Sequence, residues 1–364
     1  MSPLTGLKTI YFLCFNKKIY PCQLERGRGV LKELHNMTVK WGIVGASGVA
    51  HRRGMPAINM AEGNELHALM VRDLERAKKL AQEHGAPYYY DSVEGILSDP
   101  QIDAVHIATP VYLHCEHVIQ AAEYGKHILC EKPMAMNVDE CKRMIDACEK
   151  NGVYLQICFL LRFHSCFQEI KRLVSSGVLG EIVETRVAML KSYSMEEGAW
   201  RRDPIKSGGG VLMDMGAHAI DLLSFLLGDV SEVTMLSSSK VKKWEIEETA
   251  TVIMKMKNDA NAIADTSFVV PYSESTLEIY GTAGTIIAYS GQGYQEYNVK
   301  IHINNATREE HKPPENLYKN LFEHYSRFLE DKEEAIAPGI AGQKNIEIIS
   351  AAYESFKSKR TLSI

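Results

Sequence analysis

The sequence predicts an α/β domain with a doubly wound parallel sheet, followed by an α+β domain with a large, mostly antiparallel open sheet. Residues 37–160 alternate short apolar runs with segments of helical periodicity, which is the pattern of βα units. Residues 161–364 hold several longer runs that alternate or are rich in β-branched residues. A chain of 364 residues is long enough to form two such domains.

Composition excludes several classes of protein. The net charge is -5 and no dense basic stripe occurs, so we do not expect nucleic acid as a partner. No apolar run approaches the length that crosses a bilayer, so we expect no membrane association. The eight cysteines are scattered without metal-binding spacing, which favours buried, reduced thiols, no metal site and a cytoplasmic location.

Residues 1–36 look unlike the rest of the chain. The apolar stretch 9–15 is short, is followed at once by Lys17 and Lys18, and has no small-residue cleavage site, which argues against a secretory signal. We expect residues 1–36 to be a poorly structured extension and the functional fold to begin at Met37.

The first βα unit has the features of a dinucleotide site. Residues 39–44 read as a buried strand, and residues 45–50 (GASGVA) as a tight turn that opens a helix. Such a turn lets the backbone approach a pyrophosphate, and the helix N-terminus supplies N–H groups. Ser47 replaces the second glycine of the usual pattern, so the motif alone is a weak signal. Arg72 follows the next strand in place of an acidic residue, which favours NADP, although a solvated surface arginine also fits.

Two later stretches carry groups suited to acid–base chemistry. Lys132 follows the apolar run 127–130, and Thr109 follows the run 104–108, so both lie at the carboxyl edge of the parallel sheet, where ligands bind. Asp214 and His218 are four residues apart, on one face of an expected helix. A lysine beside the reacting oxygen and a histidine titrating near neutral pH could take a proton from an alcohol while a hydride leaves its carbon. A purely structural interpretation is also open, in which Lys132 is a surface cation and Asp214 and His218 are a pair that stabilises the helix.

Taken in order, these features resemble the glucose–fructose oxidoreductase/inositol dehydrogenase family (Gfo/Idh/MocA) from about Val39 to the C-terminus. The stretches that carry the resemblance are the turn 45–50, the segments 108–114 (ATPVYLH) and 130–133 (CEKP), Trp200-Arg201 with the glycines 208–210, Asp214-x-Gly216-x-His218-x-x-Asp221, and the turn 279–285 (IYGTAGT). The resemblance implies a Rossmann dinucleotide-binding domain over 37–160 and a substrate-binding and oligomerisation domain over 161–364. It also implies NAD or NADP as the cofactor, and a homodimer, homotetramer or larger homo-oligomer formed through the open sheet.

The resemblance also implies roles for single residues. Lys132 is similar to the family's lysine that hydrogen-bonds the reacting oxygen, His218 to the general base, and Asp214 to the residue that orients substrate or base. The residues expected at the cofactor are Gly45, Ala46, Ser47, Gly48, Val49, Arg72, Thr109, Pro110, His114, Glu131 and Lys132. The chain departs from the family at Val111, where many members have asparagine, and in the apolar pair Leu160-Leu161.

We expect a polyhydroxylated ring as the substrate. The residues expected around the opening are Arg162, His164, Tyr193, Trp200, Arg201, Asp214 and His218, which offer a flat stacking surface and several donors. These suit a pyranose, the sugar of a glycoside or a cyclitol, oxidised at a ring secondary hydroxyl to a keto-sugar. The sequence thus predicts an NAD(P)-dependent dehydrogenase. Three alternatives stay open: dihydrodiol, other carbonyl or imine chemistry on the same fold; a non-catalytic nucleotide-sensing protein; and a tightly bound cofactor recycled by a second substrate.

Overall fold

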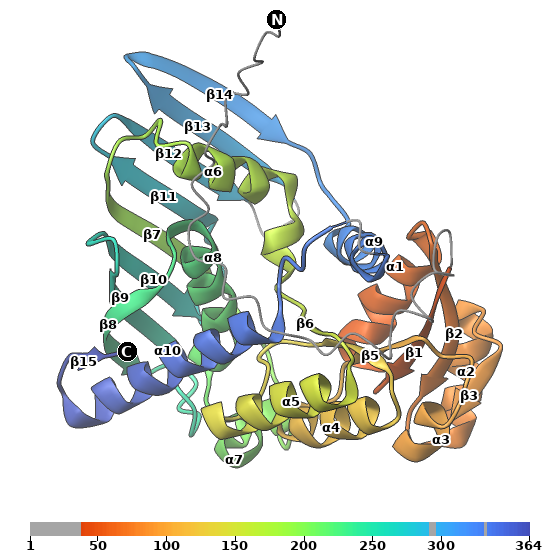
Figure 1. Cartoon of the computed structure of the whole chain (residues 1–364). Coiled ribbons are helices and arrows are strands. Elements are labelled where there is room, and N and C mark those ends of the chain that lie inside the picture. The colour runs from red at the N-terminus through yellow and green to blue at the C-terminus, as the bar shows by residue number, and fades with distance from the viewer. Residues whose placement is uncertain (1–37, 291–295, 331–332) are drawn as a thin grey trace, which may run out of the picture. The chain divides into compact units, whose positions relative to one another are not determined.

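The computed structural model describes residues 38–290, 296–330 and 333–364 (Figure 1). The segment Thr38–Ile364 forms one compact unit. The expectations for residues 1–36 and for a start at Met37 lie outside the described residues.

The first half of this unit is built on a six-stranded parallel sheet. Its strands run in the order β3-β2-β1-β4-β5-β6, and all neighbouring pairs are parallel. They are β1 (Val39–Val44), β2 (Asn64–Met70), β3 (Tyr88–Tyr90), β4 (Ala104–Ile107), β5 (His127–Cys130) and β6 (Leu155–Ile157). This order confirms the doubly wound sheet and places the reversal of winding between β1 and β4, where such sheets bind ligands.

Helices and helical turns connect these strands. They are the π-helical turn η2 (Ala50–Gly54), α1 (Met55–Met60), α2 (Leu74–His84), α3 (Val93–Leu97), η3 (Val111–Leu113), α4 (His114–Glu123) and α5 (Val138–Asn151). The Asp73 side chain accepts a hydrogen bond from Arg76 N at the start of α2, and Gly85 ends that helix in the left-handed conformation. Asn137 caps α5 in the same way.

The second half is built on a nine-stranded sheet in the order β14-β13-β12-β11-β7-β10-β9-β8-β15, in which only the β7–β10 pair is parallel among the described strands. The strands are β7 (Ile182–Leu190), β8 (Val230–Ser238), β9 (Thr249–Met256), β10 (Asn261–Ser267), β11 (Ser275–Gly281), β12 (Gly284–Ser290), β13 (Tyr297–Ile303), β14 (Ala306–Lys312) and β15 (Leu362–Ser363). The predicted mostly antiparallel sheet is confirmed. The sequence of β14 gives no strand signal because its residues are almost all polar, as suits a strand at a sheet edge.

Helices pack on this sheet and around the cleft. They are η4 (Leu160–Phe163), α6 (Ser165–Ser175), η5 (Trp200–Arg202), α7 (Pro204–Ser207), the π-helical turn η6 (Leu212–Gly216), α8 (Ala217–Leu227), α9 (Leu317–Leu329) and α10 (Gly339–Ser358). The helical segment Pro204–Leu227 is long and apolar enough to cross a bilayer by length and composition, so the prediction that no apolar stretch approaches that length was wrong. Its most apolar stretch is 78% buried inside the protein, as in a core helix.

A segment from the far end of the chain completes the core of the parallel sheet. Figure 1 shows α9 beside α1, and the two helices are in contact. Phe322 and Tyr325 of α9 pack edge-on against the buried Trp41 of β1, with ring centroids 4.9 and 5.1 Å apart. The Tyr325 hydroxyl donates to Ile128 O of β5 at 3.1 Å. The six cysteines among the described residues are buried and free, as expected.

Candidate active site

A pocket of about 810 Å³ opens at the carboxyl edge of the parallel sheet. It is lined by loops that follow strands of the parallel sheet, by residues of the second half of the chain, and by residues 314–318 at the start of α9. The predicted site residues that line it are Ser47, Gly48, Val49, Thr109, Pro110, His114, Glu131, Lys132, Tyr193, Trp200, Arg201, Asp214 and His218. The structure therefore brings together residues that are up to 171 positions apart in the chain, from Ser47 to His218.

The glycine turn divides into a structural part and a part that faces the pocket. The N–H groups of Gly45 and Ala46 both donate to Met70 O of β2, at 3.1 and 2.9 Å, so they hold the sheet together. Gly45 has φ +88°, and a Cβ there would lie 2.7 Å from Thr109 Cγ2. Glycine is therefore required where the β1 turn meets the β4 turn. Of the five turn residues predicted at the cofactor, 45–49, only Ser47, Gly48 and Val49 line the pocket.

The arginines near this turn are placed differently from the prediction. Arg72 is exposed and does not line the pocket. Arg52 and Arg53 line it instead, from the π-helical turn η2 that follows the glycine turn. Neither arginine was among the predicted site residues, although two adjacent arginines one turn after a phosphate-binding motif are a usable signal. Guanidinium groups at this position suit the charge and planar oxygen pattern of a pyrophosphate.

Lys132 and Asp214 form the polar centre of the pocket. Lys132 Nζ donates to Asp214 Oδ1 at 2.6 Å and to the backbone Asp214 O at 2.9 Å. Lys132 lies two residues beyond the end of β5, and Asp214 lies in the turn η6 before α8. The predicted meeting of these two stretches is thus present as a direct ion pair.

The charges at this centre set the protonation states of its members. Burial opposes ionisation of Asp214, but the cations of Lys132 and Arg201 outweigh it and lower its pKa to about 2. Burial and the Lys132 charge together lower the pKa of His218 to about 3. This corrects the expectation that His218 titrates near neutral pH. The imidazole is neutral at pH 7 and has a nitrogen able to accept a proton.

The Glu247 carboxylate fixes the start of the helical segment that carries Asp214 and His218. The Glu247 carboxylate accepts from Gly210 N and Leu212 N, each at 2.9 Å, and from the Tyr353 hydroxyl at 2.7 Å. A Cβ on Gly210 would lie 2.1 Å from Glu247 O, so the triple glycine allows this close approach. Asp214 lies in a π-helical turn, as do Arg52 and Arg53, and such turns are frequent at functional sites.

Glu131 forms the buried floor of the pocket. Its Oε1 accepts a hydrogen bond from the Tyr318 hydroxyl at 2.6 Å and lies 3.3 Å from His106 Nε2. Burial opposes its ionisation, but His106, Tyr318 and Lys132 together lower its pKa to about 2. A second carboxylate therefore lies next to Lys132 in the chain and keeps its charge.

His114 ties two pocket loops together. Its Nε2 lies 2.8 Å from Thr109 O, and its Nδ1 lies 3.0 Å from Pro133 O. The side chain is buried, and burial lowers its pKa despite these carbonyl contacts. His114 thus connects the loop after β4 to the residue that follows Lys132.

The structure does not bring Arg162 and His164 to the pocket. The Arg162 guanidinium pairs with Asp221 of α8, with Nη2 2.7 Å from Oδ1, and Nη1 donates to Ile336 O at 2.7 Å. His164 is fully buried, and its Nδ1 accepts a hydrogen bond from Cys166 N at 3.1 Å at the start of α6. Both side chains bind neighbouring elements, so the motif residue Asp221 holds Arg162 within the fold.

Aromatic and cationic side chains form one wall of the pocket. The Arg201 guanidinium lies over the Trp200 ring, 4.3 Å from its centroid. Tyr193 packs against Phe268, with ring centroids 5.7 Å apart, and both line the pocket. This wall offers flat apolar surface beside hydrogen-bond donors. The pocket is also lined by residues that were not among the predicted ones, which include Lys191, Phe268, Glu315, Asn316 and Tyr318.

The residues at this edge fit a dinucleotide. A tight turn opens a helix at the switch point, two arginines flank it, and the volume of about 810 Å³ lies in the range of cofactor and ligand sites. Gly48 has φ +53°, and a Cβ placed on it would meet no atom within 4 Å, so the space beside its backbone is open to a ligand. The turn and Arg52 and Arg53 would hold the phosphates. Lys132, His218 and the Trp200 wall would surround the reacting end.

Comparison with known proteins agrees with this geometry. A 1,5-anhydro-D-fructose reductase of Ensifer adhaerens is 29% identical over 307 residues, which cover 83% of this chain and 92% of the relative. A D-xylose 1-dehydrogenase (NADP(+)) of Haloferax volcanii is 34% identical over 236 residues, covering 64% of this chain and 71% of the relative. The crystal structure of an aldose-aldose oxidoreductase from Caulobacter crescentus complexed with glycerol superposes with a TM-score of 0.83, at 27% identity, over 90% of this chain and all of that one.

The family assignment follows from two matches that together span most of the described chain. Residues 39–159 match the oxidoreductase family with an NAD-binding Rossmann fold. Residues 167–287 match the GFO/IDH/MocA C-terminal domain. The predicted resemblance is confirmed, and the chain belongs to the GFO/IDH/MocA family of oxidoreductases.

Proposed function

We propose that this protein is an NAD(P)-dependent dehydrogenase that transfers a hydride between a ring secondary hydroxyl of a sugar, glycoside or cyclitol and the nicotinamide, giving a keto-sugar. The observation that carries the proposal is the ion pair of Lys132 and Asp214, 2.6 Å apart, in one pocket with His218 at the carboxyl edge of a parallel sheet. A non-catalytic nucleotide-binding protein has no need of this arrangement.

The residues of the pocket divide the proton chemistry among them. The Lys132 ammonium donates a hydrogen bond to the reacting oxygen and stabilises the negative charge that grows on it as the proton leaves. Neutral His218 accepts that proton, and Asp214 orients Lys132 and balances its charge. When bound, the nicotinamide supplies a hydride acceptor. The contacts of Glu131 with Tyr318 and of His114 with Pro133 O keep the loop that carries Lys132 in place.

For the cofactor, we propose Ser47, Gly48 and Val49 with Arg52 and Arg53 at the pyrophosphate, and Thr109 and Pro110 toward the nicotinamide. These residues line one continuous pocket. Gly45 and Ala46 support the turn from behind. We also propose that Arg72, which is exposed two residues after β2 and outside the pocket lining, pairs with a 2′-phosphate, as NADP would require. A tightly held cofactor would co-purify with the protein.

For the substrate, we propose that Trp200 stacks on the ring while Arg201 and Tyr193 bond its hydroxyl groups. The CH face of a sugar packs well on an aromatic side chain, and its hydroxyls need donors and acceptors. The similarity to the anhydrofructose reductase and the xylose dehydrogenase supports a sugar as substrate.

We further propose a cytoplasmic homo-oligomer with nucleotide-binding residues 37–160 and substrate-binding residues 161–364. The two family matches, over 39–159 and 167–287, support this division. Exposed apolar side chains on the large sheet, Val183, Leu236 and Ile253, support burial of this sheet in an oligomer. Light scattering on the purified chain would measure the oligomer size.

The test is a panel of aldoses, glycosides, cyclitols and aromatic dihydrodiols, each with NAD and with NADP, followed by absorbance of the reduced nicotinamide. We expect turnover of at least one sugar or cyclitol by the wild type and loss of it in Lys132→Ala. Turnover of dihydrodiols alone would refute the sugar assignment. Equal rates in wild type and Lys132→Ala would refute the proposed site.

A further inference from the structure

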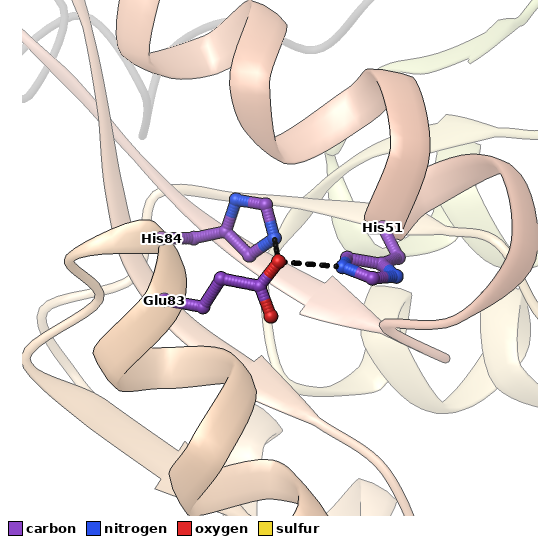
Figure 2. Close-up of side chains that lie close together, drawn as sticks. All are labelled: His51, Glu83 and His84. Atoms are coloured by element: carbon purple, nitrogen blue, oxygen red, sulfur yellow. Dashed lines mark hydrogen bonds and ion pairs between the residues drawn. The ribbon is translucent and has the colours of Figure 1, made fainter.

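A cluster of metal-ligating side chains lies outside the pocket, on the parallel-sheet half of the chain. Figure 2 shows His51, on η2, facing Glu83 and His84, the last two residues of α2. His51 Nε2 lies 3.1 Å and His84 Nε2 lies 3.8 Å from the same atom, Glu83 Oε1. The three ligand atoms all lie within 4.8 Å of one another. Two imidazole nitrogens and a carboxylate oxygen thus converge on one point.

The spacing of these atoms suits a small tetrahedral ion. Zinc bonds of about 2.0–2.1 Å at a tetrahedral angle place two ligand atoms about 3.4 Å apart. The separations of 3.1 and 3.8 Å lie on either side of that value, and the third lies within 4.8 Å, so side-chain rotation would bring the three atoms to tetrahedral spacing. Three protein ligands of this type leave a fourth position for water.

Hydrogen bonding within the cluster leaves one ligand atom unsatisfied. His84 Nε2 is shielded from solvent and has no hydrogen-bond partner among the described residues, since 3.8 Å is too long for a hydrogen bond. The backbone around it is fixed, because Asn59 Nδ2 donates to His84 O at 2.8 Å and Gly85 ends the helix. A simple ion pair of Glu83 with His51 gives this second imidazole no partner.

The charges around the cluster partly oppose an ion. A neutral imidazole and an ionised carboxylate are the forms that bind metal. Arg52 and Arg53 follow His51 in the same turn, and Lys79 lies one turn before Glu83 on α2, so these cations oppose binding. The Glu83 carboxylate is the anionic ligand that offsets them.

We propose that His51, Glu83 and His84 form a binding site for a divalent transition-metal ion of the zinc class. Mixed nitrogen and oxygen ligation favours zinc and its neighbours over magnesium, which prefers oxygen ligands alone. His51 shares its helical turn with Arg52 and Arg53, which line the pocket. An ion at this site therefore fastens the end of α2 to the turn that carries both arginines.

The test is calorimetric titration of zinc chloride into the untagged full-length protein after treatment with a chelator. We expect one ion to bind per chain at this site, and the affinity to fall at least about 100-fold in His51→Ala/His84→Ala, because changes even to residues outside the ligand set cost roughly 10–100-fold. The matched control is His302→Ala/His311→Ala, which removes two exposed histidines of β13 and β14 and should bind as the wild type does. Glu83→Gln keeps the shape of the side chain, removes the charged ligand, and should also weaken binding.

Two results would overturn the proposal. One is a wild-type chain that binds no zinc; the other is equal affinity in wild type, His51→Ala/His84→Ala and Glu83→Gln, with zinc held elsewhere. The cluster would then be an ion pair only. Melting curves of the metal-free variants check folding, and Glu83→Gln decides the matter should the double variant unfold. Because the readout is binding, failure here leaves the proposed dehydrogenase activity untouched.

Discussion

Replacing Asp214 with asparagine tests the charge balance at the centre of the pocket. The pKa of Asp214 falls from the ordinary 3.8 to about 2, because Lys132 and Arg201 outweigh the burial that would raise it. Each pKa unit corresponds to about 1.4 kcal/mol, so the ionised carboxylate contributes about 2 kcal/mol to stability at neutral pH. Asp214→Asn should lose at least about this amount, since it also leaves the half-buried Lys132 ammonium without its counter-charge.

The pH dependence makes this prediction specific. A lowered carboxylate pKa stabilises the folded state above the unfolded value of 3.8, and the contribution is lost as the pH falls toward 2. The difference in unfolding free energy between wild type and Asp214→Asn, measured by urea denaturation, should therefore shrink to about half between pH 7 and pH 3.

A matched control is available on the surface. Asp229 pairs with Lys344 at 2.6 Å, but its side chain is 44% exposed. Asp229→Asn should cost less than about 1 kcal/mol. Equal losses in the two variants, or a loss in Asp214→Asn that does not change with pH, would refute the reasoning.

Three further predictions concern the base, the cofactor and the turn. His218→Gln should lower kcat by roughly 10²–10⁴-fold. Because the pKa of His218 is about 3, kcat/KM of the wild-type enzyme should show no step from His218 titration between pH 8 and pH 5. A step near pH 6.5 that disappears in His218→Gln would contradict the structure. Arg72→Ala should raise the KM for NADP about tenfold and leave that for NAD unchanged if the guanidinium meets the 2′-phosphate; equal effects on both cofactors would exclude this contact. Gly45→Ala should be more destabilising than Gly85→Ala, because both positions have positive φ but only the Cβ at 45 collides, 2.7 Å from Thr109 Cγ2; comparable melting temperatures for the two variants would show that the turns can separate.

The elements with local signals were predictable from the sequence. The run His127–Cys130 is β5 with the predicted bounds, because the apolar residues 128–130 lie between a Gly-Lys turn and the polar pair before a proline. Asp73 and Gly85 bound α2, and both caps can be read from the sequence because capping depends on neighbouring backbone groups only. The alternation of such strands and helices was sufficient to predict the doubly wound sheet, because crossovers between parallel strands are right-handed.

Other features depend on contacts that no local pattern records. The β14 sequence is polar and becomes a strand only because β13 presents an edge to it. The sequence predicted Arg162 and His164 near the opening of the pocket. In the structure, Arg162 pairs with Asp221 and His164 binds the start of α6. A buried charged or polar side chain needs a hydrogen-bond partner, and only the tertiary structure decides which partner is near.

The sequence by itself determined the two kinds of sheet, the strand–helix alternation of the first, and the presence of a strand-end lysine together with an aspartate and a histidine four residues apart. Only the tertiary structure decided that Arg52 and Arg53 face the pocket while Arg72 is exposed, that Tyr318 from α9 reaches Glu131, and that the pKa of His218 is about 3. The physical reason is range: caps, turns and periodicity act over a few residues, whereas burial and electrostatic energies sum over every neighbour that the completed fold brings close.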